Sequence, residues 1–184
     1  MNYLKIALIS LAIITLGGCA TGAKLENMTY TDSSYFEKTF DSELKNDVQV
    51  SQVTGGEKTN PAWTSEISND AFKGALKNSL KSQGLYSESG KYALSAQLIR
   101  VDQPLFGLDF TVTTNINYKL IDTTSNQVLI NETIIAPYTA TVGDAFIAIE
   151  RLRLANEGSG KENIKFLMKK LNDLNISPNA IAIK

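Results

Sequence analysis

Alternation of apolar and polar residues is strongest in the middle of the chain, over residues 108–121. One alternate set is mostly apolar, and the other is polar as far as Lys119. The first set is Phe110, Val112, Thr114, Ile116, Tyr118 and Leu120, and the second is Thr111, Thr113, Asn115, Asn117 and Lys119. A period of two with one apolar side predicts a strand of an antiparallel sheet that is covered on a single face.

Three further strands are predicted around this one. Residues 91–102 alternate in the same way until Ile99 and Val101 take the other phase, which indicates a β-bulge. Residues 127–139 are rich in Val, Ile and Thr, and Pro137 near their end is typical of an edge strand or a bulge. A short strand around Val48 and Val50 comes first in the chain.

Two segments have the spacing of an amphipathic helix. The first, over 62–83, would begin after Pro61, be capped by Thr64 or Ser65, and stop at Gly84. Its apolar stripe is Trp63, Ile67, Ala71, Phe72, Ala75, Leu76 and Leu80. The second, over 143–173, has one stripe of Phe146, Ile149 and Leu152 and another of Ile164, Leu167, Met168, Leu171 and Leu174. Gly158-Ser159-Gly160 lies between the two stripes, and either a kink or a break into two helices fits this position.

The order strand, helix, three strands, helix predicts an α+β fold in two layers. An antiparallel sheet of about four strands would carry the two helices on one face. We expect this domain over residues 47–175, preceded by a tether and edge segment over 19–46 and followed by a tail over 176–184, in which Ala180 to Ile183 suit a short edge strand. Some aromatic residues of the tether would pack on the domain edge.

The first 18 residues have the features of a secretory signal peptide. One positive charge, Lys5, precedes an apolar run over 6–16 that is too short to remain as a membrane span. Leu16-Gly17-Gly18-Cys19 resembles the bacterial lipobox, which implies that Cys19 carries the lipid and becomes the first residue of the mature protein. The alternative is an ordinary signal peptide with Cys19 as a free thiol. Ala20 follows the cysteine, where an Asp often signals inner-membrane retention, so the resemblance implies the outer membrane, with the domain facing the periplasm.

Composition narrows the chemistry. The chain has no His and a single Cys, which excludes imidazole and thiolate catalysis and most zinc, copper or haem sites. We therefore expect no catalytic residue, no metal site and no cofactor. The formal net charge of −1 gives no reason to expect nucleic acid as a partner. A hydrolase with paired carboxylates, such as Asp122 with Glu132 or Asp109 with another acid, is a weaker hypothesis. Gly158-Ser159-Gly160-Lys161 has neither the first Gly nor the final Ser or Thr of a phosphate-binding loop.

Two surfaces are candidates for contact with a partner. Residues 104–108 form an apolar hairpin tip, where turns are normally polar, and Leu105, Phe106 and Leu108 either contact a partner or lipid or fold back over the core. The polar side of the central strand is the second surface. Its residues Thr111, Thr113, Asn115 and Asn117 either dock a protein or glycan or simply face solvent.

The run from Arg151 to Gly158, with Asn163 and Ile164 after it, is dense in charged and amide side chains. We expect Arg151, Arg153, Asn156 and Asn163 to anchor the last helix to the sheet edge or a loop, and Glu157 to form a weak helical pair with Lys161.

This run, together with the lipobox and the order of elements, is similar to small lipoproteins of the YajG type. More distantly the chain resembles accessory lipoproteins of outer-membrane assembly and export machines. The resemblance implies a non-catalytic outer-membrane lipoprotein that acts as an accessory or scaffold and binds another envelope protein. A periplasmic glycan- or lipid-binding module, with an aromatic platform from Trp63, Tyr30 or Tyr35, is the alternative. Nothing in the sequence specifies an oligomeric state.

Overall fold

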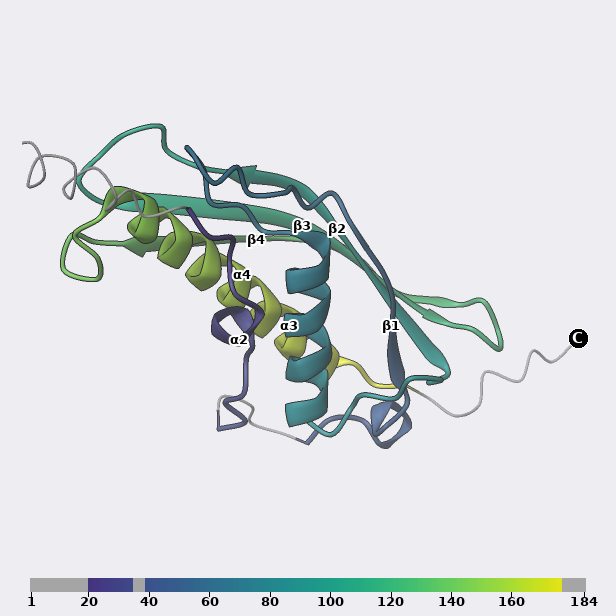
Figure 1. Cartoon of the computed structure of the whole chain (residues 1–184). Coiled ribbons are helices and arrows are strands. Elements are labelled where there is room, and N and C mark those ends of the chain that lie inside the picture. Colours follow the sequence, from purple (N-terminus) through teal and green to yellow (C-terminus); the bar gives the residue numbers. More distant parts are fainter. Residues whose placement is uncertain (1–19, 35–38, 177–184) are drawn as a thin grey trace, which may run out of the picture.

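A computed structural model describes residues 20–34 and 39–176 of the chain. Four strands lie side by side in the order β1 (Val48–Thr54), β2 (Tyr92–Asp102), β3 (Phe110–Asp122) and β4 (Val128–Ala140). The sheet bends across the molecule as one layer, and the helices form the other layer (Figure 1). The predicted α+β fold in two layers is confirmed, and its strands and two long helices follow the predicted order.

The sheet is mixed, whereas all its strands were expected to be antiparallel. β2, β3 and β4 are joined by hairpins and run antiparallel, but β1 pairs with β2 in parallel. The reason is the connection between them. Helix α3 (Asn69–Ser82) returns the chain to the end at which β1 began, so β2 runs in the same direction as β1.

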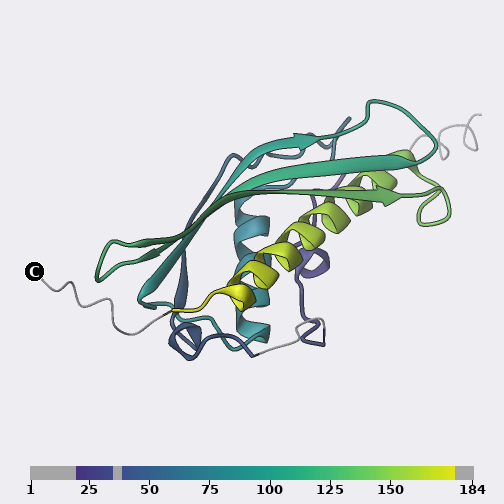
Figure 2. The ribbon, with the colours of Figure 1, turned by 180° about the vertical axis from the view of Figure 1, so that it is seen from behind.

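Helices α3 and α4 (Ala148–Asp173) pack on the same face of the sheet, with the short helix α2 (Leu25–Met28) beside them (Figure 2). The main core lies between the layers. Its largest fully buried side chains include Tyr92, Tyr118, Phe72, Met28, Leu76, Leu94, Ile116 and Leu120. A turn of 3₁₀ helix, Ser42–Leu44, precedes β1 and buries Leu44.

Two local features of the strands match the sequence. The register between β2 and β3 shifts between Leu98 and Arg100, so Ile99 is the extra residue of the predicted bulge and is exposed. Pro137 lies in β4, which is an edge strand. The edge position tolerates a residue without a backbone N–H.

Helix α3 begins later than predicted. Its cap is Ser68, whose hydroxyl accepts from the amide of Ala71, rather than Thr64 or Ser65. The backbone of the preceding residues is occupied by other partners: the carbonyls of Pro61 and Glu66 accept from the amides of Ala20 and Ala23. Trp63 is therefore outside the helix and 74% exposed. Gly84 ends the helix as predicted, with φ of +68°, in the left-handed region that favours glycine.

Helix α4 is continuous through Gly158-Ser159-Gly160, which answers the question that the sequence left open. The small residues let neighbours approach. A side chain at Gly158 would meet the ring of Tyr138, and one at Gly160 would meet the sulfur of Met28. The helix begins at Ala148 rather than 143, because Asp144 accepts from the amide and the hydroxyl of Thr141 and forms a turn there. Phe146 is thus exposed instead of lying in the predicted apolar stripe.

On the side of α4 that faces the sheet, buried polar side chains near these glycines bond to β3 and β4. The Ser159 hydroxyl donates to the carbonyl of Ala136 at 2.7 Å and accepts from the amide of Thr114 at 2.9 Å. The Asn163 amide donates to the carbonyls of Thr114 and Ile134, at 3.2 and 3.0 Å. The predicted anchoring role of Asn163 is confirmed, and its partners are backbone groups inside the sheet.

The Tyr118 hydroxyl completes this group by donating to the Asn163 side-chain oxygen at 2.9 Å. The side chain is fully buried, and burial raises the pKa of the Tyr118 phenol well above its usual value. A buried phenol stays protonated in the folded chain at pH values where the unfolded chain has lost this proton.

We therefore predict that stability falls as pH rises above about 10, because unfolding then releases the Tyr118 proton. Tyr118→Phe removes this contribution. Urea unfolding at about pH 9 and about pH 11 should show that the wild type loses about 1.4 kcal/mol more than the variant does. Equal losses in both proteins would contradict the prediction.

Candidate functional site

The chain from Ala20 to Tyr30 is packed on the domain, which corrects the prediction of a tether over this part of residues 19–46. The Ala20 amide donates to the Pro61 carbonyl at 2.9 Å, and the Ser65 hydroxyl donates to the Thr21 carbonyl at 2.8 Å. Ala20, Ala23, Met28 and Tyr30 are buried. Packing of Tyr30 agrees with the expectation for the aromatic residues of this segment, whereas Tyr35 and Phe36 lie outside the described residues.

A buried carboxylate holds this segment to α4. Glu157 accepts from the backbone amide of Lys24 at 2.9 Å and from the side-chain amide of Asn27 at 2.7 Å. Its charge is balanced by Arg153 at 2.7 Å, which also pairs with Glu150 at 2.9 Å. Glu157 is thus paired with the residue four positions before it, rather than with Lys161 as predicted. The arrangement satisfies a buried charge with an ion pair and two further donors.

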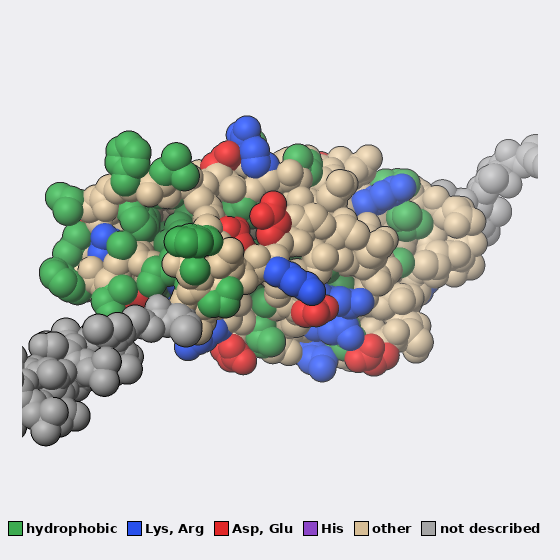
Figure 3. Space-filling model, turned by 45° about the horizontal axis from the view of Figure 1, so that its top comes forward, with side chains coloured by type: hydrophobic (Ala, Val, Ile, Leu, Met, Phe, Trp, Pro, Cys, Tyr) green, Lys and Arg blue, Asp and Glu red, His purple; other side chains and the backbone are tan. Residues whose placement is uncertain are grey.

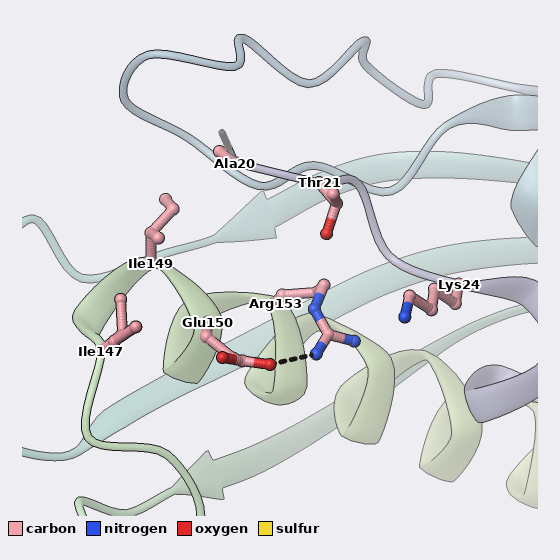
Figure 4. Close-up of a pocket in the computed structure, with 7 residues that line it drawn as sticks. All are labelled: Ala20, Thr21, Lys24, Ile147, Ile149, Glu150 and Arg153. Atoms are coloured by element: carbon pink, nitrogen blue, oxygen red, sulfur yellow. Dashed lines mark hydrogen bonds and ion pairs between the residues drawn. The ribbon is translucent and has the colours of Figure 1, made fainter. Parts of the chain in front are cut away.

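A hollow of about 180 Å³ lies where this segment meets the start of α4. Figure 4 shows Ala20, Thr21 and Lys24 on one side of it and Ile147, Ile149, Glu150 and Arg153 on the other. Ala20, which follows the predicted lipidation site in sequence, is one of the residues that line the hollow. Cys19 itself, the predicted lipidation site, lies outside the described residues.

Three loops near this hollow expose large hydrophobic side chains at one end of the molecule. They are the β2–β3 loop over 103–109, the β4–α4 loop over 141–147, and the loop over 60–64. The five most exposed large hydrophobic side chains of the described residues all lie in these loops. They are Leu105 (95%), Phe146 (88%), Phe106 (86%), Leu108 (79%) and Trp63 (74%). We call these five residues the apolar end, and Figure 3 shows hydrophobic side chains gathered at the left end of the molecule.

The hypothesis that Leu105 and Phe106 fold back over the core is therefore wrong. The small cluster of Phe110, Val112, Ala140, Leu152 and Ala155 already closes this end of the core. The spacing of apolar residues predicts that Trp63 and Phe146 belong to helix stripes. Both helices begin later in the structure, so these two residues lie in loops and belong to the apolar end. The Asp144 turn and the Asn60-Pro61 turn were the signals that could have placed them in loops.

Polar contacts hold the three loops together. The Gln103 side-chain amide donates to the Ser65 carbonyl, to Glu66 and to Asn156 at 2.9 to 3.1 Å. Asp109 accepts from the Val142 amide at 3.3 Å. These bonds connect neighbouring loops, so their apolar side chains are presented on one surface.

Two residues of α4 bond these loops to the helix. Arg151 donates to the carbonyls of Ala145 and Phe146, at 2.7 and 2.9 Å, and lies over the ring of Phe110. Asn156 donates to the Ser65 carbonyl at 2.6 Å. With Asn163, these contacts confirm the anchoring role predicted for Arg151, Asn156 and Asn163. The prediction is wrong for Arg153, whose ion pairs are with Glu150 and Glu157 of the same helix.

The outer face of the sheet is the second candidate surface. The helices pack on the opposite face (Figures 1 and 2), and the side chains of Thr111, Thr113, Asn115 and Asn117 belong to the uncovered face. Several are bonded to their neighbours. Thr111 bonds to Thr139 at 2.8 Å, Asn115 to Asp102 at 3.3 Å, and Asn117 to Thr133 at 3.3 Å. The face is therefore an ordered and mostly polar surface that includes the charged residues Asp102 and Lys119, and Ile135 interrupts it with 60% exposure.

The carboxylates considered for hydrolysis are in separate places. Asp122 pairs with Lys91 at 3.2 Å and Glu132 with Lys170 at 2.7 Å, and Asp109 belongs to the loop contact described above. Bonds from Thr124, Lys91 and Ser125 lower the pKa of Asp122 despite the opposing effect of desolvation. Burial, reinforced by Glu57, raises the pKa of Glu66, which lines a second hollow of about 300 Å³ with Glu57 and Arg100. Within residues 20–34 and 39–176, no three acidic side chains come close enough to hold a metal ion.

Trp63 and Tyr30 do not form a shared aromatic platform, and Tyr35 lies outside the described residues. Trp63 is exposed at the apolar end, whereas Tyr30 is buried in the core. Within the described ranges, no helix has both the length and the apolar character needed to cross a bilayer.

No family model and no curated protein matches this sequence. Solved structures resemble its fold at low identity. A PelC variant from Paraburkholderia phytofirmans, solved as a dodecamer, is 14% identical, with a TM-score of 0.50 over 73% of this chain and 91% of that chain. Protein XCC0632 of the family DUF330 from Xanthomonas campestris is 11% identical, with a TM-score of 0.48 over 73% and 92%. A protein from Caulobacter crescentus classed provisionally as a lipoprotein is 14% identical, with a TM-score of 0.43 over 54% and 80%.

If Glu157 holds the amino-terminal segment, Glu157→Gln should loosen it. The neutral side chain leaves the buried Arg153 with Glu150 alone and weakens the bond from the Lys24 amide. We expect faster hydrogen exchange at the Lys24 amide and a loss of about 2 kcal/mol in urea unfolding.

Glu162→Gln is the matched control. It breaks a more exposed pair with Lys165 on the same helix and should cost about 0.5 kcal/mol or less. Unchanged exchange at Lys24 in the Glu157 variant would show that other contacts hold the segment.

Proposed function

We propose that this chain is a lipid-anchored, non-catalytic accessory protein of the Gram-negative envelope. Cys19 carries the lipid in the inner leaflet of the outer membrane, and the domain faces the periplasm. The observation that carries the proposal is the packing of the chain from Ala20 onward. The predicted lipid site immediately precedes a residue that is hydrogen-bonded to the domain surface. A lipid there would hold the whole domain at the bilayer, since acyl chains contribute about 0.8 kcal/mol per buried methylene.

Two further observations support an accessory role. The polar residues of α4 would suggest a catalytic cluster in another fold. Here they bond to backbone groups of the sheet and the loops. The carboxylates first considered for hydrolysis are engaged in separate ion pairs and loop contacts. We therefore assign the protein a binding role, with the outer face of β3 and β4 as the surface for an envelope protein.

The alternative, a glycan- or lipid-binding module, has less support. The hollow beside Ala20 is lined by Lys24, Glu150 and Arg153 as well as by two isoleucines. A third hollow, of about 440 Å³, contains Asp144, Glu157, Lys161 and Glu162. Both are open and charged, whereas a site for an acyl chain is mostly apolar and enclosed.

The anchor is tested directly on the protein isolated from envelopes. Mass spectrometry should find a mature chain that begins at Cys19 and carries acyl groups, and Cys19→Ser should abolish both this modification and the cleavage. A mature product that begins elsewhere, or a free thiol at Cys19, would overturn the proposed anchor.

The partner surface is tested by crosslinking in cells. A photoreactive amino acid at position 113, on the outer face of β3, should give one discrete protein adduct. The matched position is 81, which is exposed on α3 in the other layer and should give none. Asn115→Arg, which places a charge beside position 113, should abolish the adduct. Similar adducts from both positions would show that the outer face is not a specific docking surface.

A further inference from the structure

The apolar end and Ala20, the residue that follows the predicted lipid site in sequence, lie at the same end of the domain. Ala20 is bonded to Pro61, and Trp63 is two residues beyond Pro61, a span of at most roughly 7 Å of chain. Ala20 also lines a hollow with Ile147, which is next to Phe146 in sequence. Cys19 immediately precedes Ala20 in the sequence.

The loops that form the apolar end are fixed in position. Gln103 links the β2–β3 loop to Ser65 and to α4, and Asp109 links it to the β4–α4 loop. Arg151 holds the Phe146 backbone from inside the domain. The exposure of Leu105 and Phe106 therefore belongs to an ordered surface.

Large hydrophobic side chains that are exposed together indicate contact with another molecule. Five large side chains, three of them aromatic or indole, are from 74% to 95% exposed. Patches of this kind mark contact with a protein or a membrane. Aromatic rings prefer the boundary between headgroups and acyl chains, and the neighbouring lipid site would place them at that depth.

We propose that the apolar end inserts into the headgroup region of the leaflet that holds the Cys19 lipid. This inference rests on the proposed lipid anchor and adds a second contact with the bilayer, made by the domain itself. Lipid then replaces water around Trp63, Leu105, Phe106, Leu108 and Phe146, and the domain takes one orientation on the membrane. The occupant is the bilayer, because the covalent neighbour of Ala20 would already be attached to it.

Trp63 is the single tryptophan of the chain, so its fluorescence reports on this surface without labelling. The test uses the mature protein isolated from envelopes and reconstituted in vesicles of phosphatidylethanolamine and phosphatidylglycerol. Trp63 emission should shift to shorter wavelength and be quenched by lipids brominated near the headgroup. Leu105→Ser combined with Phe106→Ser should lose most of the shift and of the quenching.

The matched control is Val128→Ser combined with Ile135→Ser, which removes two exposed apolar side chains of β4 outside the apolar end. It should behave as the wild type. Urea unfolding of both double variants checks that neither result reflects loss of the fold. Emission that is unchanged by vesicles in the wild type would overturn the proposal.

The failure of the anchor and the failure of the insertion are distinguishable. Mass spectrometry of the same sample reports the lipid. If the lipid is present but Trp63 is not quenched, the anchor stands and the insertion is wrong. If the lipid is absent, an excess of vesicles with brominated lipids still shows whether Trp63 is quenched, and this result decides whether the apolar end inserts. A discrete protein adduct from a photoreactive residue at position 106 in cells would assign the apolar end to a protein partner and overturn the membrane contact.

Discussion

The arrangement of this protein depends on the buried polar side of helix α4. Over little more than two turns, Asn156, Glu157, Ser159 and Asn163 bond to four separate parts of the chain: the 65–66 loop, the amino-terminal segment, β3 and β4. Buried polar groups are costly unless each has a partner, so these bonds fix the helix in one register against the sheet. An apolar stripe alone would allow the helix to slide or rotate more freely.

The glycines and the polar side chains of α4 act together. Gly158 and Gly160 cost helix stability in isolation, but they remove the side chains that would separate α4 from Tyr138 and Met28. Close approach then brings Ser159 within bonding distance of the sheet backbone. The contact between Gly160 and Met28 also positions α2, and through it the segment that leads back to Ala20.

The sequence predicted most of the scaffold because its signals are periodic and local. The strands, the bulge at Ile99, the edge position of Pro137 and the stop at Gly84 follow from spacing and from single-residue preferences. The parallel pairing of β1, the late starts of α3 and α4 and the packing of residues 20–30 do not. The packing of residues 20–30 depends on contacts between residues far apart in sequence, such as Ala20 with Pro61 and Lys24 with Glu157. The late start of α4 follows instead from a local turn, in which Asp144 accepts from Thr141, and the apolar spacing does not reveal this turn. The apolar end was only partly predicted: Leu105, Phe106 and Leu108 stood out in a turn, whereas Trp63 and Phe146 fitted a helical spacing that the loops override.

The hydrogen bond between Ala20 and Pro61 fixes the chain to the domain one residue after the proposed anchor, so no flexible tether separates the two. Lipoproteins with a long flexible leader can search a volume whose radius grows with the square root of the leader length. Here only one residue separates the domain from the proposed anchor. The domain would therefore encounter other molecules by moving within the plane of the membrane. Such a protein would meet only molecules that share its bilayer or reach close to it, and their local concentration would replace a large contact area as the source of binding strength.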